Sequence, residues 1–490
     1  MKTGNAGANS YDVVVIGGGA SGLAAALTAA EGGAKVALFE KMRFLGGSSN
    51  FAEGMFAVES EMQRKIYMNY SRDDAFRAMM DYSHWRANPR LVRAFIDASA
   101  GTIDWLQRQG VEFIEAMTNL PDGLRTVHIL KGPSGARGSP MIKTLAARAK
   151  EKGATIFTGT PVRQLIRRGK DGVTGVSIER DGKQETISAG AVIIASGGYG
   201  NNQEWIKKYC GLDLGVNLIP VRNYEKTGDG IRMAWESGAA EEGMGVLHFF
   251  RAGPFGPGAR MMGHLECSGL QPYLWVNRQG ERFCDETVAF NDSYMGNTVA
   301  RLKEGYSYSI FDEAARRNMT EHGIDKYVGY KNMPGTRLTD LDVELKAALS
   351  KKNPDVAVAG SIEELAQKTG IDPAELKKTL DEYNGYCVQG RDPVFAKAPR
   401  YLRPLKEPPF YAVKAYTVFL GSLGGIKINH NMEVVDKKGG VIPGLYAVGT
   451  DAGGLYGDTY CFLPASGTTL GFALNSGRIA GKNALEYIKS

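Results

Sequence analysis

Cysteine and histidine are scarce in this chain of 490 residues. It has five cysteines and six histidines. No two cysteines have the CxxC or CxxCH spacing of metal, redox or c-type haem motifs, and an odd number of scattered cysteines does not predict a disulfide framework. No group of histidines has metal-ligand spacing. The sequence therefore predicts no metal site and no haem of its own.

Long hydrophobic runs and blocks of one charge are also missing. No uncharged run approaches the roughly 18 residues that span a membrane, and residues 1–10 lack the apolar core of a signal peptide. Lys and Arg number 59 against 53 Asp and Glu, a net charge of +6, with no basic run that contains interleaved aromatic residues. We therefore expect a cytoplasmic protein with no membrane span and no nucleic-acid partner.

Glycine, by contrast, is abundant, and it clusters where apolar strands would pass into helices. Residues 11–16 (YDVVVI) form the continuous apolar run of a buried parallel strand, and GGGASG follows at once. Gly17, Gly19 and Gly22 have GxGxxG spacing. The first allows a tight turn, the second lets a diphosphate approach the backbone, and the third permits close packing of helix on strand.

A second apolar strand, residues 35–40, ends on Glu40. An acidic residue about 20 positions after the glycine motif can accept hydrogen bonds from the ribose of a dinucleotide. Strand, glycine turn, alanine-rich helix, second strand and terminal acid are all in register. Together they predict a Rossmann-like dinucleotide-binding unit, and the chain length favours a second domain.

Three later segments favour FAD over NAD. Residues 45–55 (LGGSSNFAEGM) form a loop of small residues on which an isoalloxazine ring could lie. Residues 190–200 and 444–460 are each an apolar strand followed by a glycine-rich loop. Residues 466–481 then predict a helix whose N-terminus could point at the flavin pyrimidine.

These segments resemble the fumarate reductase and succinate dehydrogenase flavoprotein superfamily, including its soluble 3-ketosteroid dehydrogenase and urocanate reductase branches. TGDG (residues 227–230) and VNRQGERFCDE (residues 276–286) match internal motifs of that family. The resemblance covers nearly the whole chain and implies an α/β fold. A discontinuous Rossmann-like FAD-binding domain (residues 1–238 and 400–490) would carry an inserted α+β capping domain (residues 239–399). Residues 361–390 predict two amphipathic helices opened by Ser361 and Asp372.

The resemblance also implies which residues bind FAD. Glu40 would bind the ribose and the backbone of Val162 the adenine, and Asp451 stands where the family usually has a glutamate on the ribityl chain. No histidine occurs in residues 45–54, where the respiratory branch attaches its flavin, so we expect non-covalent FAD. The other predicted cofactor residues are Gly17, Gly19, Ala20, Ser21, Gly22, Lys41, Gly47, Ser48, Ser49, Asn50, Ala52, Glu53, Gly54, Ser196, Gly197, Asp229, Ser466, Thr469 and Leu470.

The family's usual substrate-binding charges are absent. Phe290 stands at the position of the acid arginine, four residues after Glu286; LGSLGG (residues 420–425) replaces a motif with two histidines; and Tyr460 falls near the place of another arginine. Aromatic residues coincide with several of these positions, which favours a flat, apolar substrate. The alternative is that most of them are core residues. The set comprises Phe249, Phe250, Phe255, Phe290, Tyr294, Phe419, Tyr460 and Phe462.

The chemistry of such a flavin is hydride transfer between N5 and a carbon next to an activating carbonyl, coupled to proton transfer at the neighbouring carbon. Tyr460 is the first candidate for the proton or for the hydrogen bond to the carbonyl, with a packed loop aromatic as the alternative. Tyr294 and Arg251 are further catalytic candidates, and an interdomain salt bridge is the alternative for Arg251. Glu266 aligns with a family glutamate near the substrate but is also consistent with a structural carboxylate. His84 and His128 are expected to be structural.

The sequence thus predicts an FAD-dependent oxidoreductase acting on CH–CH groups. It would reduce or form a C=C bond conjugated to a carbonyl in a bulky apolar or aromatic small molecule. The alternatives are a 3-ketosteroid-type dehydrogenase and an electron-transfer flavoprotein subunit without its own substrate. No second GxGxxG unit is present in a strand–helix setting, so we expect an unidentified protein or small carrier as electron donor or acceptor.

Overall fold

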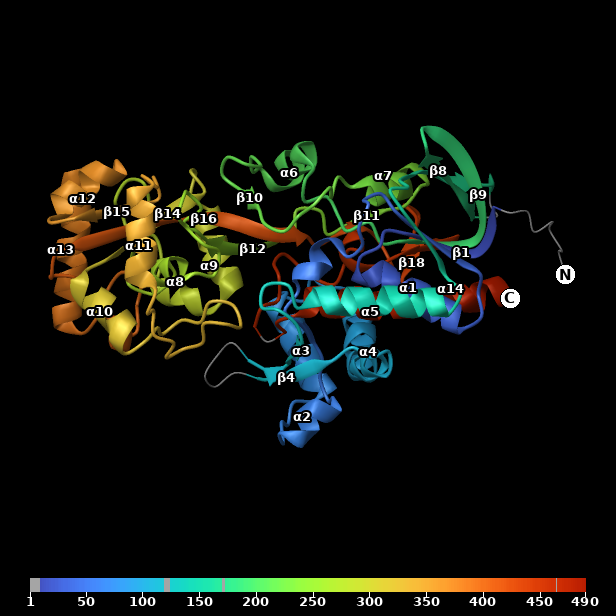
Figure 1. Ribbon diagram of the computed structural model, residues 1–490, viewed down its shortest axis with the longest axis horizontal. Coiled ribbons are helices and arrows are strands. Elements are labelled where there is room, and N and C mark those ends of the chain that lie inside the picture. Colours follow the sequence, from blue (N-terminus) through green and yellow to red (C-terminus); the bar gives the residue numbers. More distant parts are fainter. Residues whose placement is uncertain (1–8, 119–123, 170–171, 464) are drawn as a thin grey trace.

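The computed structural model describes residues 9–118, 124–169, 172–463 and 465–490. Figure 1 shows an elongated molecule with two lobes and a downward projection between them. The lobe near both termini contains β1, α1, α5 and α14, and the opposite lobe contains α10 to α13. Among the described residues, no helix is both long and apolar enough to cross a bilayer.

The terminal lobe is built on a sheet with a parallel centre. β1 (Ser10–Ile16) pairs in parallel with β2 (Val36–Glu40) on one side and β9 (Lys183–Ile194) on the other. β6 (Thr155–Thr158) and β19 (Val441–Ala447) extend this parallel centre, and β18 (Glu433–Val435) is an antiparallel edge. β8 (Val173–Arg180) pairs antiparallel with β9, and β7 (Val162–Arg167) pairs antiparallel with β8. The predicted Rossmann-like unit is confirmed.

The C-terminal helix closes this lobe by packing on the first helix. α14 (Thr468–Lys489) lies against α1 (Ala20–Glu31), with α5 (Gly138–Glu151) also on α1. A Cβ on Gly477 would lie 2.2 Å from the Ser21 carbonyl oxygen, and one on Gly481 would lie 2.6 Å from that of Ala25. Glycine is therefore required where the two backbones meet. The end of the chain thus returns to the glycine motif at its beginning.

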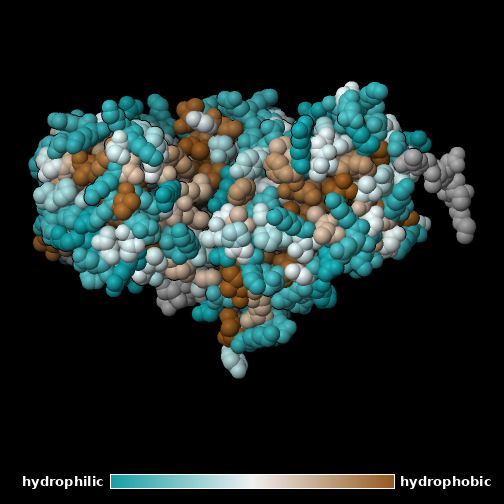
Figure 2. All heavy atoms as spheres, in the orientation of Figure 1, coloured by the Kyte–Doolittle hydropathy of each residue, from teal (hydrophilic) through white to brown (hydrophobic). Residues whose placement is uncertain are grey.

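The projection in Figure 1 is a small subdomain beside the terminal lobe. It contains α2 (Glu61–Lys65), α3 (Arg72–Tyr82), α4 (Pro89–Arg108) and the antiparallel sheet β3 (Gly54–Phe56), β5 (Val127–Leu130) and β4 (Phe113–Met117). The side chain of Asn88 caps α4. Hydrophobic surface gathers on this projection in Figure 2, and Ile66, Tyr67 and Ile114 are exposed there.

The second lobe is a mixed sheet covered by helices. β16 (Phe410–Ser422) is its long central strand and pairs with β10 (Ile219–Pro220), β12 (Leu247–Ala252), β14 (Tyr306–Phe311) and β15 (Val356–Ala359); β13 (Leu274–Val276) lies beside β14. Its helices are α8 (His264–Gly269), α9 (Asp292–Ala300), α10 (Glu313–Glu321), α11 (Leu341–Ser350), α12 (Ile362–Thr369) and α13 (Pro373–Gln389). Ser361 and Asp372 cap α12 and α13 as predicted.

The sheet of the second lobe includes strands from both sides of the predicted insertion. β10 and β16 belong to the sheet of the second lobe although they lie outside residues 239–399. α6 (Gln203–Cys210), α7 (Asp229–Glu236) and the pair β11 (Glu241–Glu242) and β17 (Gly425–Ile426) lie along the connection. The predicted α/β fold with an α+β cap is confirmed, while the domain limits at residues 238 and 400 stay a prediction.

Candidate flavin and substrate site

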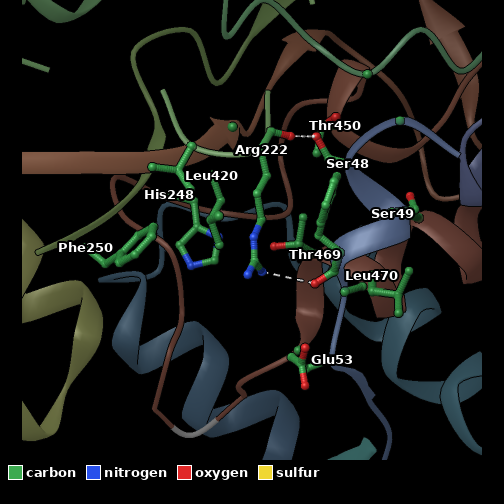
Figure 3. Close-up of a pocket in the computed structure, with 18 of the residues that line it drawn as sticks. Ser48, Ser49, Glu53, Arg222, His248, Phe250, Leu420, Thr450, Thr469 and Leu470 are labelled. Atoms are coloured by element: carbon green, nitrogen blue, oxygen red, sulfur yellow. Dashed lines mark hydrogen bonds between the residues drawn. The ribbon is translucent and has the colours of Figure 1, made fainter. Parts of the chain in front are cut away.

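A cavity of about 380 Å³ lies between the carboxyl ends of the parallel strands and the second lobe. Open α/β sheets bind their ligands at this edge, where the strand order reverses. The glycine loop after β1 and the loop after β9 line one side, and residues from β12 and residues 326–330 line the other. Figure 3 shows side chains from the two sides pointing into one space.

The three motif glycines have different surroundings. Gly17 has a φ of +111°, and a Cβ there would lie 2.2 Å from the Ala195 carbonyl oxygen; a Cβ on Gly22 would lie 1.9 Å from that of Gly17. These two glycines allow the turn and the close packing. A Cβ on Gly19 would meet no atom nearer than 3.9 Å, and Gly19 lines the cavity. The space beside it is open to a ligand.

Glu40 and Lys41 form the far end of the cavity at the tip of β2. Glu40 Oε2 accepts a hydrogen bond from Gly18 N–H at 2.7 Å, and Oε1 accepts one from Met42 N–H at 2.7 Å. The carboxylate is thereby fixed at the edge of the open space. Lys41 Nζ donates to Asp229 Oδ2 at 2.8 Å, so Asp229 orients a residue of the cavity wall without lining the cavity itself.

The loop of small residues after β2 forms the floor. Ala20 N–H, at the start of α1, donates to Ser49 Oγ at 3.2 Å. Glu53 accepts a hydrogen bond from Arg137 Nε at 2.9 Å, which holds the end of the loop. α1 has no acidic residue in its first turn, so its N-terminus can attract a phosphate. The open space at Gly19, the helix N-terminus and the fixed Glu40 fit a dinucleotide such as FAD.

Most of the predicted cofactor residues line the cavity. Six do not: Gly17, Gly22, Asn50, Val162, Asp229 and Asp451. Those that line it are Gly19, Ala20, Ser21, Glu40, Lys41, Gly47, Ser48, Ser49, Ala52, Glu53, Gly54, Ser196, Gly197, Ser466, Thr469 and Leu470.

Asp451 supports the loop after β9. Its Oδ1 accepts hydrogen bonds from Ser196 Oγ and Gly198 N–H, both at 2.9 Å, and its Oδ2 accepts one from Gly197 N–H at 2.9 Å. Burial raises the pKa of this carboxyl. In this arrangement Asp451 shapes the loop that lines the cavity.

Tyr460 lines the cavity and is almost completely buried. Its hydroxyl oxygen accepts a hydrogen bond from Gly467 N–H at 3.0 Å, and the side chains of Thr468 and Thr469 also interact with the phenol. Its ring stacks on that of His248, with centroids 3.6 Å apart and planes inclined by 22°. Burial raises the pKa of Tyr460, so the phenol keeps its proton. Tyr460 can therefore act as a hydrogen-bond donor or an acid in the cavity.

His248 is a cavity residue that the sequence analysis missed. It lies on β12, and its Nδ1 is buried with no hydrogen-bond partner among the described residues. Burial lowers its pKa to about 3, so the imidazole is neutral. The available signal was a polar residue within the apolar strand VLHFF.

Only part of the aromatic set faces the cavity. Phe250, Tyr460 and Phe462 line it, whereas Phe249, Phe255, Phe290, Tyr294 and Phe419 do not. Phe290 packs on Tyr401, and Tyr294 stacks on Tyr82 with 48% of its surface exposed. These five therefore lie outside the cavity: Phe419 is buried in the core, as the alternative expects, whereas Phe255 and Tyr294 are exposed. Tyr327 and Tyr330, from a segment that the sequence did not single out, line the cavity instead.

Arg251 lines the cavity but forms no salt bridge among the described residues, so the expected interdomain pair is wrong. Its guanidinium donates to Ser307 Oγ at 3.0 Å, Ser309 Oγ at 3.0 Å and the Gly269 carbonyl at 2.7 Å. It also lies 4.2 Å from the ring centroid of Trp275. All these partners are in the second lobe. Burial lowers the pKa of Arg251 to about 9.

Glu266 lines the cavity near Lys326. Both of its oxygens accept backbone hydrogen bonds, from Gly253 N–H at 3.2 Å and from Met262 N–H. Burial raises its pKa to about 7. Lys326 Nζ donates to Asp292 Oδ1 at 2.9 Å and to the Tyr327 carbonyl at 2.7 Å. His84 is an exposed partner of Asp458, and the buried His128 pairs with Ser60.

Comparison with known proteins identifies the family. The model of the FAD binding domain family matches residues 12–462. The chain belongs to this family. Vinyl phenol reductase of Lactiplantibacillus plantarum is 39% identical over 487 residues, 98% of this chain and 97% of that protein.

Two solved structures are similar over nearly the whole chain. The open conformation of a flavocytochrome c3 fumarate reductase has a TM-score of 0.75 and 25% identity, covering 99% of this chain and 80% of that one. 3-Ketosteroid-Δ4-(5α)-dehydrogenase from Rhodococcus jostii RHA1 has a TM-score of 0.75 and 23% identity, covering 99% and 98%; this likeness shows the fold alone. The predicted resemblance is confirmed, and the protein is an FAD-dependent oxidoreductase of the group that acts on CH–CH bonds.

Within this FAD-binding family member, residues 221–226 form a wall that the sequence analysis did not predict. Arg222 and Lys226 both line the cavity. Burial lowers the pKa of Lys226 to about 8, against the attraction of Asp451. Both residues closely precede the TGDG motif. The motif located this segment in the sequence, but it did not indicate that the two side chains turn inward. Non-covalent attachment of FAD stays a prediction.

Proposed function

We propose that this flavoenzyme reduces the C=C bond of a flat aromatic alkene of the vinyl phenol class. The observation that carries the proposal is that Phe250, Tyr460 and Phe462 line the same cavity as the loops expected to hold the flavin. An aromatic wall facing a flavin forms a slot suited to a planar ring. The relationship to vinyl phenol reductase over almost the full length of both chains supports the same substrate class.

A para-hydroxyl group gives such an alkene the activation that a carbonyl gives an enone. When the terminal carbon of a 4-vinylphenol takes up a proton and the phenol releases its own to solvent, the product is a quinone methide, whose C=C bond is conjugated to a carbonyl. Bound reduced FAD supplies a hydride. Addition of that hydride at the benzylic carbon leaves a phenolate, and a final proton gives the ethylphenol.

Tyr460 is the proposed donor of the first proton. Its phenol is buried and protonated, and its oxygen is held by Gly467 N–H. His248 is neutral and stacks on it, so we assign His248 the role of holding the Tyr460 ring in place. A positioned acid of this kind contributes about 10²- to 10⁴-fold to the rate.

The test is anaerobic. The FAD-loaded protein is photoreduced and mixed with 4-vinylphenol, a cinnamate, an enone, fumarate and a steroid enone, while flavin absorbance is followed near 450 nm. We expect fast reoxidation by 4-vinylphenol and slow or no reoxidation by fumarate. Fast reoxidation by fumarate or the steroid alone would replace this proposal. Reoxidation by none of the compounds would favour a flavin-carrying subunit whose substrate pocket is unused.

A further inference from the structure

The cationic side chains of the cavity differ in how many of their donors are already used. Lys41 is paired with Asp229, Lys326 with Asp292, and Arg251 is bound by two serines and a carbonyl. Among the residues that the structure describes, Arg222, Lys226 and Arg251 line the cavity without an ion pair, and of these three only Arg251 has several of its donors used by the protein. Glu53 and Glu266 attract the Arg222 guanidinium, but neither forms an ion pair with it. A partly buried cation without a direct carboxylate contact is costly unless a ligand supplies one.

Arg222 stands where the two lobes meet. Its NH1 donates to the Phe51 carbonyl at 3.2 Å, on the flavin-side loop, and its NH2 lies 3.9 Å from Met261 Sδ, in the second lobe. A guanidinium has five N–H donors, so these contacts leave several available. In Figure 3 the guanidinium points into the space that His248 also enters. Burial lowers the pKa of Arg222.

The backbone at Arg222 is held in an uncommon conformation. Its φ is +58°, in the left-handed region that a bulky residue rarely adopts. The hydroxyl of Ser48 donates to the Arg222 carbonyl and holds this turn against the flavin-side loop. Such strain persists where surrounding contacts fix it, and it is common at functional sites. Here its consequence is that the side chain is directed inward.

Lys226 has a different neighbourhood. Its Cε lies 3.5 Å from the place of a Cβ on Gly197, and its Nζ lies 3.5 Å from that of a Cβ on Gly421. Gly197 belongs to the loop after β9, which is part of the expected flavin site. Of Arg222 and Lys226, Arg222 is therefore the one placed at the boundary between the flavin loop and the second lobe.

We propose that Arg222 binds the ring oxygen of the substrate and makes the enzyme specific for alkenes with a para-hydroxyl group. This inference rests on the proposed function. The guanidinium stabilises negative charge on the oxygen when the phenol loses its proton, and again when hydride addition converts the quinone methide carbonyl into a phenolate. Donors aimed at a developing oxyanion are worth about 10²- to 10³-fold in rate.

The experiment uses FAD-loaded wild-type protein, Arg222→Gln, Arg222→Lys and the exposed Arg260→Gln as a matched control. Each is reduced with stoichiometric dithionite and mixed with 4-vinylphenol, 3-vinylphenol or 4-methoxystyrene. In 3-vinylphenol the oxygen cannot conjugate with the protonated alkene as a quinone methide, and in the ether it cannot become an anion. We expect the wild type and Arg260→Gln to reduce 4-vinylphenol at least about 100-fold faster than the other two alkenes.

In Arg222→Gln the rate with saturating 4-vinylphenol should fall about 100-fold and the preference for the para isomer should shrink, while Arg222→Lys recovers part of both. FAD content and the flavin spectrum should match the wild type. An unchanged preference in Arg222→Gln overturns the inference, as does a loss of FAD, which would place Arg222 in the flavin site. If no alkene reoxidises the wild-type flavin, the proposed function fails; if wild-type and Arg222→Gln proteins are equally fast, only Arg222 is wrong.

Discussion

The two sides of the cavity are made in different ways. On the flavin side, Gly17, Gly19 and Gly22 act through backbone and empty space, and Glu40 is fixed by two backbone N–H groups. On the opposite side, side chains carry the chemistry, and Tyr460 and His248 meet there although they are more than 200 positions apart. A site made of backbone tolerates almost no change of residue. A site made of side chains can exchange one chemistry for another while the fold persists.

The dependence of the flavin side on backbone and empty space can be tested by adding a methyl group at two glycines of the same motif. In Gly22→Ala the Cβ would lie 1.9 Å from the Gly17 carbonyl oxygen, so α1 must move away from β1. We expect lost FAD binding and a free energy of unfolding lower by about 1–3 kcal/mol. Flavin content after purification and urea unfolding measure the two effects.

Gly19→Ala is the matched variant. Its Cβ meets no atom within 3.9 Å, so the apoprotein should unfold at the wild-type urea concentration while FAD binds at least about tenfold more weakly, roughly 1.4 kcal/mol. Equal destabilisation of the two apoproteins would contradict the distinction between a packing glycine and a glycine that faces the cofactor.

On the side-chain wall, Tyr460→Phe should lower the rate of alkene reduction about 10²- to 10⁴-fold, or about 3–5 kcal/mol of barrier, because the proposed acid is removed. FAD should remain bound. Tyr294→Phe is the control: this ring stacks on Tyr82 outside the cavity, and its rate should stay within about twofold of wild type. Flavin reoxidation in single turnover measures both. Similar losses in the two variants would show that the cavity wall is wrongly assigned.

Glu266 tests the side-chain wall through the dependence of stability on pH. Its pKa is raised from 4.5 to about 7 by burial, so the folded protein favours the neutral carboxyl. Below about pH 4.5 the carboxyl is neutral in both the folded and the unfolded protein, so its burial carries no ionisation penalty. Above about pH 7 it is ionised in both states, and the folded protein carries the full penalty. Relative to Glu266→Gln, the wild type should lose about 3 kcal/mol of unfolding free energy across that window. If the unfolding free energies of wild type and Glu266→Gln change in parallel from pH 5 to 8, Glu266 stays ionised in the folded protein and the prediction is wrong.

Local patterns predicted the parts that local geometry determines. The strands and helix around Gly17, Glu40 at the tip of β2 and the caps Ser361 and Asp372 all follow from spacing over a few residues. The family motifs extended this to most of the cavity's flavin side. The same reasoning failed for Arg251, whose partners Ser307 and Ser309 lie on β14, two strands away in the sheet. No local pattern indicates which of several buried hydroxyl groups will meet a guanidinium.

By itself, the sequence determined that this chain builds a Rossmann-like FAD site, because tight turns, helix starts and close backbone contacts need particular residues at fixed spacing. Only the tertiary structure decided which side chains face the substrate. It brought His248 from β12 against Tyr460, turned Arg222 inward through a left-handed backbone, and left Phe290 and Tyr294 outside. The physical reason is that backbone requirements are local, whereas the direction of a side chain depends on every element packed around it.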